Sequence, residues 1–155
     1  MTNETVNAYW QKFLSTLPLD SPYQTKPFIS EGWGDSPEMA DELGALIAQG
    51  IKTGTCSALW EWEAEGNTPT QVGEVTVVLN GQGEPLCIVE TVDVFIRNYN
   101  EVDAEFACSE GEGDLSLKYW REAHRNFFSR TLSKIGKEFS EEMPLVCEQF
   151  RVIYK

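Results

Sequence analysis

A lysine and a threonine stand three positions apart in residues 50–55, which read GIKTGT. The segment joins a helical pattern to a strand-like run, and backbone amides and side chains at such a junction can converge on a ligand. It is not a Walker A loop, because here the lysine precedes the second glycine. Lys52 and Thr55 are therefore candidates for chemistry, and the alternative is a turn with a solvated lysine.

The acidic run at residues 110–114 reads EGEGD and places its carboxylates at alternate positions, like the start of a calcium-binding loop. An EF-hand would next require a glycine and later a glutamate, where this chain has leucine and arginine. We therefore expect no calcium site. Instead, Asp114 caps a helix and either Glu110 or Glu112 points into a pocket.

His124 is the only histidine, and no cysteine lies within ten residues of it, so the spacing does not predict a zinc site or any other metal centre. A catalytic pair of His124 with Cys56 or Cys108 stays open, because such partners meet in space rather than in sequence. His124 follows Trp120 by four positions and precedes Phe127 by three, which favours packing near the apolar stripe of a helix.

Tryptophan rings offer stacking surfaces for a nucleobase, and Trp33, Trp60 and Trp62 lie in the less regular parts of the chain. The alternative is that they fill the interior. We predict Trp33 and Trp60 as ligand-binding residues, together with Glu112.

The elements that must position these residues follow from periodicity and capping. Helical spacing of apolar residues predicts an N-terminal helix that Thr2 or Asn3 caps, and Ser36-Pro37 begins a second helix that Gly50 ends. A third helix is predicted from Asp114. Between the first two helices we expect an ordered loop or linker. Strands are expected at residues 56–62, 72–79, 86–96 and 145–154, and together they suggest a curved antiparallel sheet.

Four blocks of sequence resemble the ASCH-domain family: residues 33–35 (WGD), 50–55 (GIKTGT), 85–91 (PLCIVET) and 106–121 (FACSEGEGDLSLKYWR). The resemblance implies an α+β, PUA-like fold, a small β-barrel with flanking helices. It also implies a division into an N-terminal helix with its connecting loop at residues 1–32 and an ASCH domain at residues 33–155, which together form one compact domain. The N-terminal helix looks like the extension of one bacterial subgroup.

The resemblance carries three functions, namely RNA binding, ribonuclease activity and hydrolysis of N4-acetylcytidine to cytidine. For the amidohydrolase members it implies a catalytic set of Lys52, Thr55 and Glu110, with Glu112 as a neighbouring alternative to Glu110. Thr55 would attack the acyl carbon. Lys52 would accept the hydroxyl proton if its pKa is depressed, or stabilise the oxyanion if it stays charged. Glu110 would hold Lys52 or pass a proton to the leaving amine.

The net charge favours a small neutral ligand over a long nucleic acid. The formal net charge is −13, because 12 basic residues face 25 acidic ones, and this charge repels a long polyanion but not a neutral nucleoside. No apolar run is long enough to span a membrane, and the N-terminus does not resemble a secretory signal, so we expect a cytoplasmic protein with reduced cysteines.

The leading hypothesis is an amidohydrolase for an acylated cytidine-type nucleoside that needs no cofactor and binds neither membrane nor DNA. The alternative is a module that binds single-stranded RNA, or a ribonuclease, using the same pocket.

Overall fold

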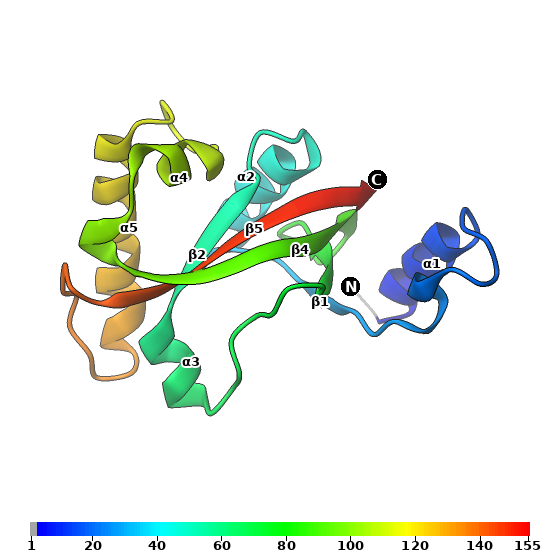
Figure 1. The fold of residues 1–155 in the computed structure, drawn as a ribbon, viewed down its shortest axis with the longest axis horizontal. Helices are drawn as coiled ribbons and strands as arrows, with labels where there is room; N and C mark the ends of the chain where they lie inside the picture. The colour runs from blue at the N-terminus through cyan, green and yellow to red at the C-terminus, as the bar shows by residue number, and fades with distance from the viewer. Residues whose placement is uncertain (1–2) are drawn as a thin grey trace. The chain divides into compact units, whose positions relative to one another are not determined.

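The structure, a computed structural model, describes residues 3–155, so the predicted cap at Thr2 lies outside the described residues. Two compact units are described separately below. The first unit comprises Met1–Gly50, Gly73–Glu90 and Arg151–Lys155, and the second comprises Ile51–Val72 and Thr91–Phe150. The helices are α1 (Asn3–Leu14), α2 (Pro37–Ala48), α3 (Leu59–Glu65), α4 (Ala104–Ser109) and α5 (Leu117–Ser133). The strands are β1 (Ile29–Glu31), β2 (Gly54–Ala58), β3 (Val75–Leu79), β4 (Pro85–Asn98) and β5 (Pro144–Tyr154) (Figure 1).

The strands belong to one sheet in the order β1-β3-β4-β5-β2, and β4 and β5 each have residues in both units. In the first unit, β3 pairs antiparallel with β4 and parallel with β1. In the second unit, β2 pairs antiparallel with β5. The prediction of an antiparallel sheet was therefore wrong for β1, which lies in a stretch that was expected to be a loop. Only three residues long, β1 is too short to show a strand period.

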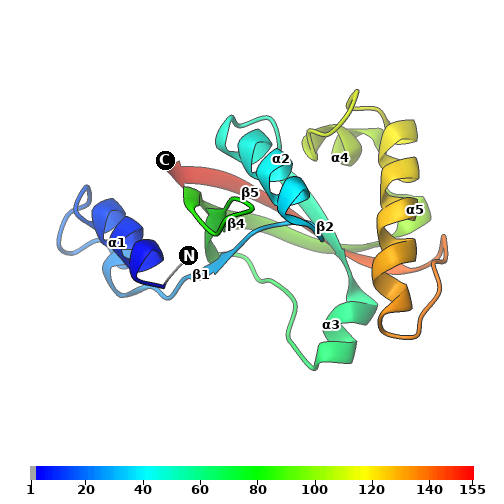
Figure 2. The ribbon, with the colours of Figure 1, turned by 180° about the vertical axis from the view of Figure 1, so that it is seen from behind.

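Aromatic packing holds α1 within the first unit. The Trp10 ring stacks on Phe28 with 4.3 Å between ring centroids, and Phe28 comes directly before β1 in the chain. Figure 2 shows the segment that joins α1 to β1. The second helix begins as predicted: the hydroxyl of Ser36 accepts the N–H of Met39, and Pro37 is the first helical residue.

A surface charge cluster, here called the Glu90 cluster, ties the same segment to β4 in the first unit. The carboxylate of Glu90 accepts hydrogen bonds from Tyr23 Oη at 3.0 Å, Lys26 Nζ at 3.2 Å and Arg151 Nη2 at 2.8 Å. The side chain of Arg151 is 63% exposed, so this cluster meets solvent.

The core of the second unit forms where α5 packs on the sheet, with Trp120, Phe128 and Leu132 buried. Helices α4 and α5 lie side by side in both ribbon views (Figures 1 and 2). The predicted start of α5 at Asp114 was two residues early. Ser116 caps the helix by accepting the N–H of Tyr119, whereas Asp114 accepts the N–H of Ser116 in the preceding turn.

The predicted strand at residues 56–62 was wrong in its second half, where α3 begins at Leu59. Its sequence contains leucine, alanine and three glutamates, which favour a helix, and Gly66 closes it in the left-handed conformation with φ 70°. Trp60 and Trp62 therefore lie on a helix. Over residues 3–155, no helix has the length and apolar character that crossing a membrane requires.

Candidate functional site

Lys52 lies just before β2 and is 1% exposed. Its ammonium donates to three acceptors: Glu110 Oε1 at 2.9 Å, Glu112 Oε2 at 3.0 Å and the backbone oxygen of Glu110 at 3.3 Å. An ammonium has three donors, so these contacts satisfy it completely. The sequence-based alternative of a solvated lysine is wrong.

The turn after α4 is held against the backbone of residues 51–53. Gly111 has φ +72°, and a Cβ at this position would lie 2.6 Å from the carbonyl oxygen of Ile51. The N–H of Thr53 donates to the carbonyl of Ser109 at 2.7 Å. Only a glycine permits this close approach, which brings the carboxylates of Glu110 and Glu112 within hydrogen-bond distance of the lysine ammonium.

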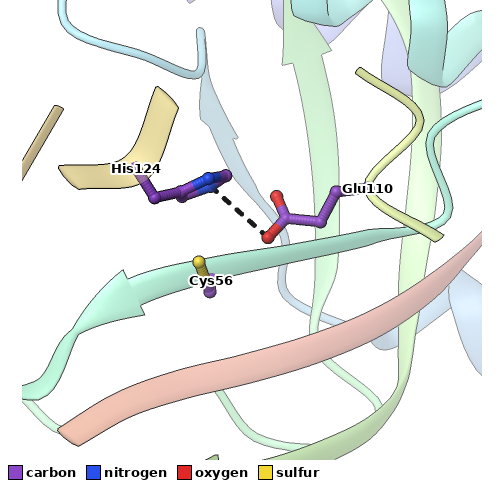
Figure 3. A group of neighbouring side chains, drawn as sticks. All are labelled: Cys56, Glu110 and His124. Carbon is purple, nitrogen blue, oxygen red and sulfur yellow. Dashed lines mark ion pairs between the residues drawn. The ribbon is translucent and has the colours of Figure 1, made fainter. Parts of the chain in front are cut away.

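Glu110 is 1% exposed, and its second carboxylate oxygen also has partners. Oε2 accepts the indole N–H of Trp120 at 2.7 Å and lies 3.5 Å from His124 Nε2. Figure 3 shows the imidazole of His124 directed at this carboxylate. Because both oxygens are engaged, Glu110 is an internal anchor for the groups around it.

His124 has an acceptor at each ring nitrogen. Its ring stacks on Trp120 at 4.2 Å, which agrees with the predicted packing role, and Nδ1 lies 2.8 Å from the carbonyl oxygen of Trp120. A carbonyl oxygen near Nδ1 and a carboxylate near Nε2 are both acceptors, and this arrangement favours the protonated ring. The bond to Glu110 was not predicted from sequence.

The charges of this group offset one another. Burial alone would lower the pKa of Lys52, but Glu110 and Glu112 outweigh burial and raise it above the ordinary 10.5. Burial likewise opposes ionisation of Glu110, yet Lys52 and His124 hold its pKa below the ordinary 4.5. Burial would lower the pKa of His124 and Glu110 raises it above 6.5. Lys52 and His124 thus face the carboxylates of Glu110 and Glu112, which favour the charged form of each.

Cys56, on β2, lies beside Glu110 and His124, and the thiol and the imidazole both face the carboxylate in Figure 3. One donor atom from each of the three residues falls within 4.8 Å of the others. These are zinc-ligand types, but a metal would have to displace protons from both the thiol and the imidazole. Burial and the neighbouring Glu110 raise the pKa of Cys56 well above 9.0, so the thiolate needed for metal binding or nucleophilic attack is disfavoured.

Of the remaining predicted site residues, Thr55 and Trp60 belong to the second unit and Trp33 to the first. Thr55 pairs with Glu148 across β2 and β5, and side-chain alternation directs it to the face of β2 opposite Cys56. Trp60 packs against the core of the second unit, with Lys137 Nζ 5.6 Å from its ring centroid. Trp33 belongs to the first unit, where its indole N–H donates to Glu31 at 3.0 Å.

The structure therefore brings together Lys52, Glu110 and Glu112 from the predicted set. It adds three residues that the prediction did not assign to this site, namely Cys56, Trp120 and His124. Trp120 and His124 stand four positions apart on α5, so helical spacing places them on one face. That spacing was visible in the sequence, but the carboxylate that they share was not.

The mixed sheet, its helices and the buried lysine–glutamate centre define an α+β protein of the PUA-like class. The chain belongs to the ASCH-domain family, whose model matches residues 30–154. It is similar to the crystal structure of an ASCH domain from Lactobacillus crispatus JV V101, with 38% identity, a TM-score of 0.92 and coverage of 98% of this chain and 96% of that one.

A protein from Enterococcus faecalis V583 is similar as well, with 36% identity, a TM-score of 0.86 and coverage of 99% of this chain and 90% of that one. No curated protein matches the chain significantly. The predicted family and fold class are thus confirmed.

Proposed function

We propose that this protein is an amidohydrolase that removes the acyl group from an N4-acylated cytidine-type nucleoside in the cytoplasm. The observation that carries the proposal is the position of Glu112. Its side chain is 22% exposed, whereas Lys52, to which it is bonded, is 1% exposed. Glu112 therefore stands between solvent and a buried positive charge.

Substrate would reach Lys52 by taking the place of the Glu112 carboxylate. The acyl carbonyl oxygen then accepts a hydrogen bond from the Lys52 ammonium, which stabilises the oxyanion as it forms. The raised pKa of Lys52 favours this role over that of a base. Glu110 keeps the ammonium in place through its 2.9 Å contact, which makes it a positioning residue in this scheme.

The displaced Glu112 carboxylate serves as the proton carrier. It accepts a proton from the attacking water as the new C–O bond forms at the acyl carbon. It then delivers that proton to N4 as the C–N bond breaks, so that cytidine leaves. Attack by water releases the carboxylic acid directly, without an acyl-enzyme ester on Thr55.

The test is chromatographic detection of cytidine after incubation of the purified protein with N4-acetylcytidine. Glu112→Gln keeps the shape of the side chain and removes the proton acceptor, so turnover should fall by about 100-fold or more. Glu138→Gln, at an exposed glutamate on the same unit, is the matched control and should leave turnover unchanged. Thr55→Val should leave turnover unchanged, because strand alternation directs Thr55 to the face of β2 opposite Cys56 and attack by water does not require its hydroxyl.

Equal turnover by the parent and Glu112→Gln would overturn this assignment. Absence of turnover by the parent would overturn the activity itself. In that case, salt-sensitive binding or cleavage of short single-stranded RNA would support the alternative.

A further inference from the structure

A small cavity lies in the second unit, beside the first half of α5. Its volume is about 320 Å³, which is at the lower end of the range for small-molecule sites. Its lining residues are all different from those of the Lys52 site. They come from α5, from the 3-10 helix η2 (Tyr99–Glu101) and from the segment before β5, and they are Tyr99, Asn100, Arg121, Glu122, Arg125 and Glu141.

Hydrogen bonds hold the walls of this cavity together. The N–H of Tyr99 donates to the carbonyl of Met143 at 2.9 Å. The N–H of Asn100 donates to the carbonyl of Glu141, also at 2.9 Å. The phenol of Tyr99 donates to the carbonyl of Arg121, which ties η2 to α5. Because these contacts exist before a ligand binds, binding does not incur the entropic cost of ordering the walls.

The two arginines of the cavity differ in whether their charge is paired. Arg125 donates to Glu141 at 3.1 Å, and its guanidinium lies over the Phe139 ring, 4.6 Å from the centroid. Within the described part of the chain, the guanidinium of Arg121 has no hydrogen bond and no ion pair. Its charge does reach the phenol of Tyr99, where Arg125 and Arg121 oppose the rise in pKa that burial causes. Arg121 therefore brings an unpaired positive charge and unused donors to the cavity.

The charges around the cavity favour a ligand with a single negative charge. Glu122 and Glu141 are among the lining residues, and their carboxylates repel a dianion such as phosphate more strongly than a monoanion. Because Arg125 is already paired with Glu141, the cation that remains is Arg121. The planar fork of a guanidinium matches a carboxylate, with which it forms two parallel hydrogen bonds. The side-chain amide of Asn100, which has no partner among the described residues, offers a further donor.

We propose that this cavity is a binding site for a small monocarboxylate, whose carboxylate is bound by the guanidinium of Arg121 and the amide of Asn100. The volume suits an acid of few atoms, and the one unpaired arginine supplies the counter-charge. The site does not depend on the proposed hydrolysis, in which Arg121 takes no part.

The experiment is an NMR titration of the isotopically labelled protein with sodium acetate, and in parallel with sodium phosphate, at an ionic strength kept constant with sodium chloride. The Nε–Hε signal of Arg121 reports binding in the parent and is assigned by its disappearance in Arg121→Gln. The side-chain amide signal of Asn100 reports binding in every variant. Arg121→Lys keeps the charge without the fork. Lys134→Gln is the control, because it removes an exposed positive charge just beyond α5 in the same unit.

We expect acetate to shift the Arg121 signal to saturation and to bind more tightly than phosphate. Arg121→Gln should raise the Kd for acetate by about tenfold or more, the loss expected for a hydrogen bond to a charged group. Arg121→Lys should also raise Kd, because lysine lacks the fork, and Lys134→Gln should behave as the parent. Thermal unfolding of each variant checks that the fold is retained.

Two results would overturn the site itself. One is a shift of the Arg121 signal that does not saturate with acetate, and the other is a parental Kd in Arg121→Gln. Tighter binding of phosphate than of acetate at the same ionic strength would overturn the assignment to a monocarboxylate.

Discussion

Two glutamates in this protein each accept hydrogen bonds from several side chains, but in different surroundings. Glu110, in the second unit, is paired with Lys52, and the two side chains are 2% and 1% exposed. Glu90, in the first unit, is 13% exposed and pairs with Lys26 and Arg151, which are 30% and 63% exposed. Both are pairs of a carboxylate with a basic side chain, but the Glu90 pairs are accessible to solvent and the Glu110 pair is not.

This difference in solvent separates a structural contact from a candidate for chemistry. Water and salt screen the Glu90 cluster, which acts mainly to hold an N-terminal segment on β4. Around Glu110 there is little solvent to screen the charges, so each partner strongly controls the protonation of the others. A buried ammonium that stays charged can act on a substrate carbonyl, whereas an exposed one mostly interacts with water.

The same substitution at the two glutamates should have unequal effects on stability. Glu110→Gln leaves Lys52 and His124 without their shared counter-charge, and removing one partner of a buried ion pair costs about 3–5 kcal/mol. Glu90→Gln should cost about 1 kcal/mol or less. Urea unfolding at pH 7 measures both. Equal losses would mean that burial does not distinguish the clusters.

A second pair of variants examines the turn that builds the buried cluster. Gly111→Ala forces a Cβ against the Ile51 carbonyl as well as a left-handed backbone, and we expect it to cost more than 2 kcal/mol, on the order of the strain and overpacking terms together. Gly66→Ala is the control, because Gly66 has φ +70° and nothing within 4 Å of the added Cβ. It should cost about 1 kcal/mol. Urea unfolding that gives equal losses would contradict the close approach.

The two clusters should also differ in how stability depends on pH. The pKa values of Glu110 and Glu90 are both lowered, Glu110 by Lys52 and His124 against burial and Glu90 by its hydrogen-bond partners against burial. Each contribution is present above pH 4.5 and is lost as the pH falls through the folded-state value. Both clusters should therefore lose their contribution to the free energy of unfolding at acid pH.

Only the Glu110 cluster, through His124, should also lose stability as the pH rises; this decrease is the alkaline limb of the stability curve. The pKa of His124 is raised by Glu110, so its contribution is complete below 6.5 and is lost as the pH rises through the folded-state value. The slope there has an upper limit of about 1.4 kcal/mol per pH unit, the value for one proton. His124→Gln should flatten this limb in urea unfolding between pH 6 and 9, while Lys26→Met should leave it unchanged. An unchanged limb in His124→Gln would show that His124 does not carry it.

The smallest effect is expected at the rim of the surface cluster. Arg151→Ala removes one partner of Glu90 that is 63% exposed, and the loss should be below about 1 kcal/mol and should diminish further in 1 M salt. The control is the same salt series on Glu110→Gln, whose loss should hardly change. If the stability loss in Arg151→Ala did not depend on salt, the Arg151–Glu90 pair would be less accessible to solvent than its exposed fraction indicates.

The sequence predicted helices correctly where a capping residue and the helical spacing of apolar residues agreed. Ser36 and Pro37 defined the start of α2, and the spacing of Trp120 and Phe128 identified α5. The strand predicted through Trp60 and Trp62 failed because the alternation of tryptophan and glutamate there imitates a strand period, while helix propensity and the closing Gly66 prevailed.

The sequence predicted only part of the candidate site. Lys52 and Glu110 are 58 positions apart, so their pairing came from the family resemblance and not from any local pattern. The bond from His124 to Glu110 depends on how α5 packs beside α4, which local spacing does not determine. Thr55 fitted the motif, yet strand alternation directs it away from the face that Cys56 occupies.

The proposed chemistry requires Lys52 to carry a fixed positive charge. The direct measurement is a pH titration of the lysine Cε and Nζ signals by heteronuclear NMR, with Lys52 assigned by the signal that disappears in a Lys52→Met variant. We expect the Lys52 signal to titrate with a pKa above 10.5, because Glu110 and Glu112 raise it against the effect of burial. A Lys52 pKa below 10.5 that leaves the amine neutral at pH 7 would contradict the account and make Lys52 a base.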